Sequence, residues 1–258
     1  MTKIAFAGDW HGTTGWARMC LRSLGEYGVK TLVHVGDFAI GFHDTDSKYL
    51  TPVSEAAREH GITILIVPGN HENWDLINAL PVIETGEYAG WLDLAPNIVV
   101  APRGHRWEIE GVSFVGLGGG NSIDYQRRIQ GRDWWREEAI TQADLYRTMD
   151  GGHAEVMVAH VAPFNAVYQL DSMGWGETAV RYSDESRMVM GLAVDAVKPK
   201  FFFHGHYHVD KRQVVHAKDE QGVSYTTEYV SLGRDTQRNN LALFDLDTRA
   251  INFIPWPY

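Results

Sequence analysis

Five short apolar runs in this chain each end directly at an Asp, Asn or His, and this repeated arrangement limits the fold more than any other feature. One run, residues 63–68, leads straight into Gly69-Asn70-His71-Glu72. The polar residues that follow the five runs are Asp9 and His11, Asp37, Asn70 and His71, His160, and His206 and His208. In open α/β sheets, ligands bind beyond the carboxyl ends of the strands. We therefore expect these side chains to meet at one edge of a parallel sheet.

Strands and helices alternate over the first quarter of the chain. Strands are expected at 4–7, 31–35 and 62–67, and helices at 14–27 and 46–60, which is typical of right-handed βαβ units. Further strands are expected at 98–100, 106–109, 112–117, 155–159 and 201–203, and further helices at 73–80, 134–149 and 184–197. The tail alternates with period two at 212–216, 223–230, 241–246 and 251–254, which predicts antiparallel strands of a second sheet. The sequence contains no repeat or linker, so we predict one α/β domain over residues 1–258 with two packed sheets.

The composition is that of an ordinary globular protein, with 44% hydrophobic residues among 258. No apolar run reaches the roughly 20 residues that span a bilayer, and the first residues do not resemble a signal peptide. Cys20 is the single cysteine, so no internal disulfide can form; together these features predict a cytoplasmic protein without a membrane partner. The net charge of -10 makes a long nucleic acid a poor candidate partner, although this is left open.

The residues after the five strands form a set of two carboxylates, one carboxamide and several imidazoles, without a thiolate. Such mixed nitrogen and oxygen donors suit Mn, Fe, Zn, Ni or Co better than Ca or Mg. The set is too large for one tetrahedral ion. A pair of ions about 3.5–4 Å apart with a shared carboxylate accounts for it.

Taken together, the motifs Asp9-x-His11, Gly36-Asp37, Gly69-Asn70-His71-Glu72, the lone His160 and Gly205-His206-x-His208 resemble those of the calcineurin-like metallophosphoesterases, in the same order. The resemblance covers residues 4–208 and implies a four-layer sandwich of two mixed sheets flanked by helices. It also implies two divalent or trivalent metal ions, with Mn²⁺ or Fe as the first expectation and Zn, Ni or Co as alternatives. Asp9, His11 and His208 would hold the first ion, and Asn70, His160 and His206 the second. Asp37 would bridge both.

The same resemblance implies hydrolysis of a phosphate ester by hydroxide shared between the two ions. His71 would not be a ligand. It would lie beside the ions and protonate the leaving group or stabilise phosphoryl oxygens, while Glu72 would support His71 or a ligand. Asp37 and His71 are therefore the predicted catalytic residues.

Residues 120–185 are predicted to form a cap that sets specificity. Within this segment or beside the metal motifs, five further residues are candidates for support of the site or for substrate contact: His204, Asn121, Asp124, Arg127 and Tyr207. For most of them a plain structural role is an open alternative. Arg127 and Arg128, for example, could meet a phosphate or could lie exposed on a loop.

The resemblance to particular members of the superfamily also implies a substrate class. Residues 36–41 do not contain the Asp-Arg-Gly ending of the related protein phosphatases. The chain looks more like compact bacterial and phage members, which cleave small phosphodiesters. We therefore predict a phosphodiesterase for small esters such as 2',3'- or 3',5'-cyclic nucleotides. A phosphomonoesterase or nuclease of the same superfamily and a non-catalytic binding scaffold are the alternatives, and the oligomeric state is not predicted.

Overall fold

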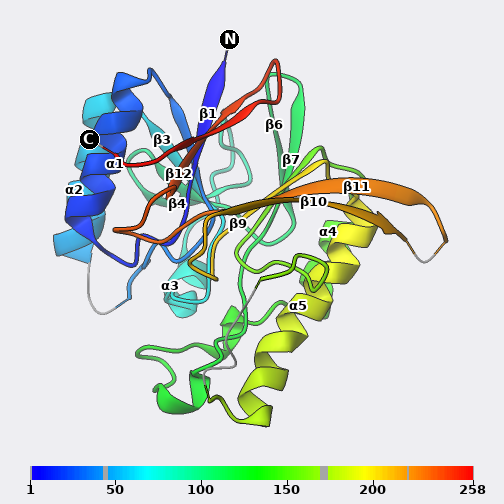
Figure 1. Ribbon diagram of the computed structural model, residues 1–258. Coiled ribbons are helices and arrows are strands. Elements are labelled where there is room, and N and C mark those ends of the chain that lie inside the picture. Colours follow the sequence, from blue (N-terminus) through cyan, green and yellow to red (C-terminus); the bar gives the residue numbers. More distant parts are fainter. Residues whose placement is uncertain (1, 43–45, 169–173, 220, 258) are drawn as a thin grey trace.

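Two β-sheets packed face to face make up the centre of the protein, whose computed structural model describes residues 2–42, 46–168, 174–219 and 221–257. Helices cover both outer faces, so that the layers run helix, sheet, sheet, helix (Figure 1). The predicted fold class, α/β with two packed mixed sheets flanked by helices, is confirmed. Among the described residues, no helix is both long enough and apolar enough to span a bilayer.

The first sheet has seven strands in the order β13-β12-β1-β2-β3-β5-β4. Its central strands β1, β2, β3 and β5 are parallel, and the flanking strands pair antiparallel. The strands are Lys3–Ala7 (β1), Thr31–His34 (β2), Thr63–Ile66 (β3), Leu92–Ala95 (β4), Ile98–Val100 (β5), Leu241–Asp245 (β12) and Ile251–Ile254 (β13).

The second sheet has six strands in the order β10-β11-β9-β8-β7-β6, again with a parallel centre and antiparallel edges. The strands are His105–Ile109 (β6), Val112–Leu117 (β7), Val156–Ala159 (β8), Phe201–His204 (β9), Lys211–Lys218 (β10) and Ser224–Ser231 (β11). The tail strands are thus divided between the sheets: β10 and β11 lie in the second, β12 and β13 in the first. Our prediction that all four tail strands belong to the second sheet was wrong for β12 and β13, because period two identifies a strand but not its partner.

Three apolar clusters hold the layers together, since both faces of each sheet are covered. In β1, Ile4 and Phe6 point into the space between the sheets, while Ala5 and Ala7 point toward the helices. The ring of Phe6 stacks on that of Phe203 in β9. This double burial explains why the parallel strands are continuous apolar runs.

The outer helical layers are α1 (Thr14–Glu26) and α2 (Thr51–His60) on the first sheet and α4 (Gln142–Asp150) and α5 (Glu177–Val197) on the second. The π-helical turn Asp46–Leu50 precedes α2, and Gly61 ends α2 in the left-handed region as expected. The short helices are α3 (Trp74–Ala79), η2 (Tyr125–Arg127) and η3 (Arg136–Glu138).

Two helix predictions in the second half were wrong. Instead of one helix over 134–149, the chain forms η3 and then α4, because Thr141 and Asp144 make a capping box that starts a new helix. The last long helix, α5, begins seven residues before the predicted start at 184. Residues 169–173 of the predicted cap lie outside the described part of the chain.

Candidate metal centre

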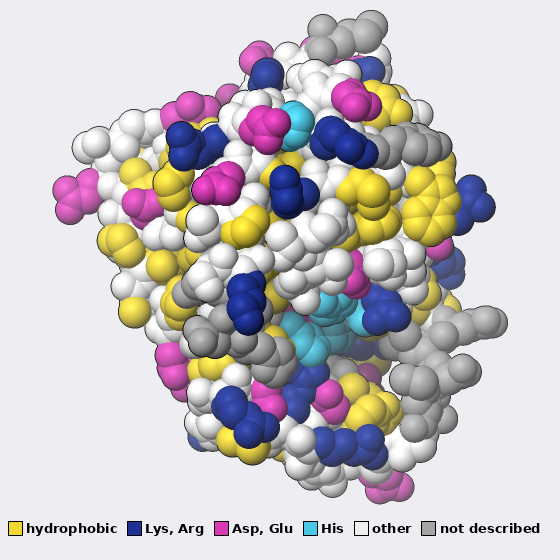
Figure 2. All heavy atoms as spheres, turned by 90° about the vertical axis from the view of Figure 1, so that its left-hand side faces the viewer, with side chains coloured by type: hydrophobic (Ala, Val, Ile, Leu, Met, Phe, Trp, Pro, Cys, Tyr) yellow, Lys and Arg dark blue, Asp and Glu magenta, His cyan; other side chains and the backbone are white. Residues whose placement is uncertain are grey.

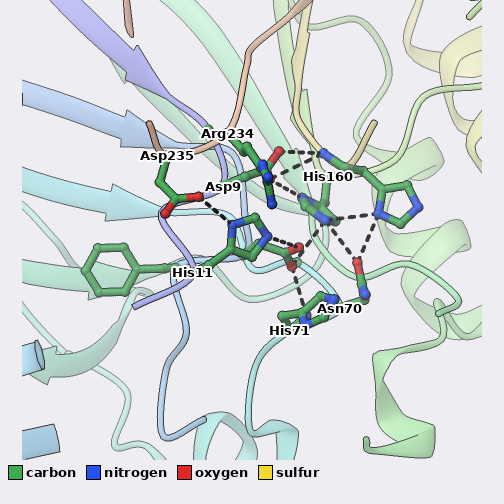
Figure 3. A network of polar contacts seen from close by, with 12 residues as sticks. Asp9, His11, Asn70, His71, His160, Arg234 and Asp235 are labelled. Carbon is green, nitrogen blue, oxygen red and sulfur yellow. Dashed lines mark hydrogen bonds and ion pairs between the residues drawn. The ribbon is translucent and has the colours of Figure 1, made fainter. Parts of the chain in front are cut away.

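The five predicted strand ends do converge, but from both sheets rather than from one. Asp9, Asp37 and Asn70 follow β1, β2 and β3 of the first sheet, and His160 and His206 follow β8 and β9 of the second. Figure 3 shows the side chains of Asp9, Asn70 and His160 gathered at one place. We call these five residues the floor. The expectation of a single parallel sheet was wrong because two sheets with the same strand direction present their carboxyl ends side by side.

The donor atoms of the floor lie in direct contact. Asn70 Oδ1 lies 3.0 Å from His160 Nε2 and 3.0 Å from His206 Nδ1. His160 Nε2 lies 3.2 Å from Asp37 Oδ1 and 3.3 Å from His206 Nδ1. Asp9 Oδ1 is 3.6 Å from His160 Nδ1. The carboxylates of Asp9 and Asp37 and the His160 ring are almost completely shielded from solvent.

Two further predicted ligands stand on the open side of the floor. His11 Nε2 lies 3.5 Å from Asp37 Oδ2, and its other ring nitrogen lies 3.3 Å from Asp235 Oδ1 (Figure 3). The His208 ring meets the His11 ring edge to face, with centroids 5.0 Å apart. The structure thus brings together all seven residues predicted to bind metal.

The backbone under these residues is unusual. Asp9, His11, Asp37, His206 and His208 all have positive φ, between 36° and 69°. Such conformations are costly for residues other than glycine and cluster at functional sites. Carbonyl and amide groups of neighbouring strand ends hold them there: Asp37 O accepts from His11 N at 2.9 Å.

Small residues let the strand ends approach one another. A Cβ atom at Gly205 would lie 2.5 Å from Asp9 Oδ1, and one at Gly36 would lie 2.5 Å from His160 Nδ1. Either contact is impossible without movement of the floor. Glycine therefore precedes the donor residue at these strand ends because backbone and donor side chains are packed against each other.

Burial and mutual charge shift the pKa values of the centre strongly. Burial raises the pKa of Asp9 to about 7. Burial alone would lower the pKa of both His11 and His160. Hydrogen bonds to Asp235 and Asp37 instead raise the pKa of His11 to about 10. The charge of Asp37 raises the pKa of His160 to about 9. The protonated imidazoles of His11 and His160 thus compensate the negative charge of the two buried carboxylates.

The donor set fits a transition-metal centre. Donors bound at about 2.1 Å to one ion lie about 3 Å apart when they stand at right angles. The contacts of 3.0–3.3 Å among Asp37, Asn70, His160 and His206 match this spacing. Moreover, Asp9, Asp37 and His160 present one ligand atom each within 4.8 Å of one another. A cation would replace the protons that these groups now share.

The predicted catalytic residue His71 lies at the edge of the floor. Its backbone N–H donates to Asp37 Oδ1 at 2.8 Å, and its ring is 5.7 Å from that of His11. Glu72 is fully buried and accepts from the backbone N–H groups of Phe38, Ile40 and Gly69. Glu72 thus braces the loop that carries Asp37.

A cavity of 340 Å³ opens beside His71 and His11. Its wall includes Phe42 and three charged residues of segment 118–140. We call these three residues, Asp124, Arg128 and Asp133, the rim. Figure 2 shows histidine side chains gathered in this hollowed region, with basic and acidic side chains around it. Arg128 pairs with Asp124 at 2.7 Å and holds its guanidinium nitrogens 3.2 and 2.9 Å from the two ring nitrogens of His71.

The remaining candidates lie behind the site rather than in it, except for Asp124. Asn121 donates to the carbonyl of Tyr182 in α5, and the Arg127 guanidinium lies 4.1 Å above the Trp175 ring. His204 is buried with its Nε2 2.5 Å from the Tyr168 hydroxyl. Tyr207 stacks on Tyr168 and donates to the carbonyl of Ala162, two residues after His160.

Three residues of the site were not singled out from the sequence: Ser122, Glu138 and Asp235. Arg128 was named together with Arg127 as a candidate for phosphate contact, but the sequence did not favour it over Arg127. Asp235 follows β11 after three residues, so the strand-end pattern that identified the floor would also have found it. Ser122, Arg128 and Glu138 lie in segment 118–140, which has no periodicity to indicate which side chains turn inward.

The fold and the donor set define a class: a two-sheet α/β sandwich with a carboxylate, carboxamide and imidazole centre at its converging strand ends. A model of the calcineurin-like phosphoesterase family matches residues 2–210, and the chain belongs to that family. Its members are metal-dependent phosphoester hydrolases.

Solved structures show the same fold at low sequence identity. The protein TT1561 of Thermus thermophilus is 11% identical, with a TM-score of 0.58 and 98% of each chain covered. A dimetal phosphatase from Danio rerio is 10% identical, with a TM-score of 0.54, and the match covers 94% of this chain and 91% of that chain. Among curated proteins, none matches the chain.

Proposed function

We propose that the protein hydrolyses small phosphodiesters, including 2',3'- or 3',5'-cyclic nucleotides, with two transition-metal ions of which Mn²⁺ and Fe are the first candidates. Asp9, His11 and His208 would hold one ion, and Asn70, His160 and His206 the other, with Asp37 shared. When bound, two such ions supply hydroxide at neutral pH and neutralise phosphoryl charge.

The observation that carries the proposal is the position of the cavity. The cavity is lined by His11, which is a proposed ligand, and by His71 and Arg128. A phosphoryl group bound beside the floor could therefore also contact the side chains of His71 and Arg128. Arg128 can donate two hydrogen bonds to phosphoryl oxygens. Burial lowers the pKa of His71 to about 4, so its ring is neutral at pH 7 and is placed to donate a hydrogen bond to a phosphoryl or leaving oxygen.

The size and charge of the cavity favour a diester over a monoester. A volume of 340 Å³ is at the small end of ligand pockets and suits a molecule of nucleotide size. Asp124 and Asp133 stand on the same wall as Arg128. These two carboxylates disfavour the second negative charge of a monoester. Segment 120–185 would set specificity by supplying this wall.

A substrate screen tests the proposal. Protein loaded with Mn²⁺ is assayed with bis(p-nitrophenyl) phosphate, p-nitrophenyl phosphate, the cyclic nucleotides and single-stranded DNA. Turnover of the small diesters is expected to be highest. Strong cleavage of DNA alone would indicate a nuclease. Turnover of nothing, with metal content well below two ions per chain, would indicate a binding scaffold.

The role of His71 has its own test. His71→Ala is expected to lower kcat by about 10²–10³-fold, because the hydrogen bond from its ring to the reacting phosphate is lost while the seven proposed ligands remain. Elemental analysis should still find two ions per chain. A parallel loss of metal and activity would make His71 a ligand instead.

A further inference from the structure

A buried carboxylate outside the proposed ligand set is connected to one of the ligands. Glu138 in η3 is fully buried, and it accepts from Ser122 Oγ at 2.6 Å, Ser122 N at 2.6 Å and Trp134 Nε1 at 2.9 Å. Ser122 in turn accepts from Asn70 Nδ2 at 2.9 Å. Glu138, Ser122 and Asn70 therefore form a chain of hydrogen bonds that ends in the floor.

Burial raises the pKa of Glu138 to about 7, while the hydrogen bonds that its carboxylate accepts favour the ionised form. With Glu138 ionised, the donors and acceptors of this chain can be arranged in one direction only. An ionised carboxylate accepts and cannot donate, so the single hydroxyl proton of Ser122 must point to Glu138. The lone pairs of Ser122 Oγ are then left to accept from an N–H group. The amide of Asn70 must turn its nitrogen toward Ser122, and its oxygen consequently faces His160 and His206.

This direction matters because a carboxamide binds a metal ion through its oxygen and not through its nitrogen. Rotation of the Asn70 side chain by half a turn would exchange the two atoms at almost no change in shape. His206 cannot by itself select the oxygen, since its ring nitrogen donates or accepts according to its tautomer. A neutral His160, which is the form that binds metal, donates from Nδ1 to the Val35 carbonyl at 2.9 Å, so its Nε2 has no proton to offer the amide oxygen. The selection must come from the other side of the amide.

We propose that Glu138 is a positioning residue which, through Ser122, fixes the amide of Asn70 with its oxygen toward the second metal ion. The inference rests on the proposed function only in that Asn70 is a ligand. It gives segment 118–140 a second role, because the segment that forms the rim also completes the metal centre.

The surroundings of Glu138 support this assignment. Its backbone carbonyl accepts from Gly120 N at 3.0 Å and from the Arg103 guanidinium at 2.9 Å, so that η3 is tied to the loop after β7. Ser122 and Asn70 are also almost entirely shielded from solvent. Partners in contact with a ligand typically contribute 10–100-fold in metal affinity.

The test is a calorimetric titration of metal-free protein with Mn²⁺, which measures both binding steps without any substrate. Ser122→Ala removes the hydroxyl that links Glu138 to Asn70. Glu138→Gln keeps the size of the side chain but reverses the direction of the hydrogen bonds, because the Gln amide can donate to Ser122 and leave the hydroxyl proton free to point to Asn70. Both variants are expected to bind the second ion about 10–100-fold more weakly and the first ion unchanged. Retained binding of the first ion shows that the variants are folded.

Trp134→Phe is the matched control. It removes a hydrogen bond of 2.9 Å from the same carboxylate without touching the link to Asn70, and the second ion should bind as in the wild type. Unchanged affinity in Ser122→Ala and Glu138→Gln would overturn the inference, as would an equal loss in Trp134→Phe. A wild-type protein that binds fewer than two ions would instead overturn the proposed function.

Discussion

The floor and the rim of the site differ in how they are built. Each floor residue lies one to four positions beyond the end of a strand, where hydrogen bonds between strand ends and close glycine contacts hold the floor in place. Three of the five, Asp9, Asp37 and His206, also have positive φ. The rim consists of loop residues that are held by contacts among side chains, such as the pair of Arg128 with Asp124. A change in the floor should therefore abolish the metal centre, whereas a change in the rim should alter substrate binding and leave the metal in place.

The largest effect is expected from Asp37→Asn. Asp37 contacts both His11 and His160 and would be shared by the two ions, so its loss removes charge from both. We expect kcat/KM to fall by at least about 10³-fold, with metal content below two ions per chain by elemental analysis. Asp124→Asn in the rim is the control and should keep both ions. Full metal content in Asp37→Asn would remove the distinction between floor and rim.

A change below the floor should reduce stability instead. Asn240 is buried, accepts from the indole N–H groups of Trp10 and Trp16, and donates to the carbonyl of Gly8, next to Asp9. Asn240→Ala leaves two buried indole donors without this acceptor, at a cost of about 3 kcal/mol in the free energy of unfolding. Thermal unfolding should shift down by roughly 10 °C. The exposed Asn252→Ala is the control, and equal melting of both variants would contradict the prediction.

Two arginines adjacent in the sequence allow the rim to be compared with its surroundings. Arg128 faces the cavity and His71, whereas Arg127 lies over Trp175. Arg128→Ala is expected to raise KM for a diester by about 10–100-fold, because one charged hydrogen-bond donor is worth about 1.5–3 kcal/mol. Metal content should not change. Arg127→Ala should behave as the wild type, and the reverse result would place the phosphate elsewhere.

The floor and His11 beside it should also control how metal affinity depends on pH. The pKa values of His11 and His160 are raised to about 10 and about 9, so both rings are protonated at pH 7 and must lose a proton to bind metal. Affinity should therefore rise from pH 7 to 9 by about tenfold per unit for each proton displaced. Below pH 7, protonation of Asp9, whose pKa is about 7, should weaken binding further.

Calorimetric titrations with Mn²⁺ in buffers of different ionisation enthalpy measure the number of protons released when the metal binds. Arg128→Ala should show the same pH dependence as the wild type, because it lies in the rim. An affinity that stays constant from pH 6 to 9 would mean that the imidazoles of His11 and His160 are already neutral.

Much of the fold could be predicted from the sequence, since double burial makes the parallel strands continuous apolar runs and period two marks the tail strands. Sheet membership could not. The strands β12 and β13 join β1 from the opposite end of the chain, and local pattern does not specify a partner so far away in the sequence. The break between η3 and α4 depends on a capping box within a segment that otherwise has a helical pattern.

For the site, the amino-acid sequence was sufficient to name the floor residues, because a polar residue within a few positions of the end of a buried strand is placed by that strand. It could not choose Arg128 over Arg127, nor connect Glu138 through Ser122 to Asn70. Those contacts join side chains 16 to 57 positions apart in segments without periodicity. Tertiary packing decides which side chains of a loop turn inward, and only this packing brings these side chains to the metal centre.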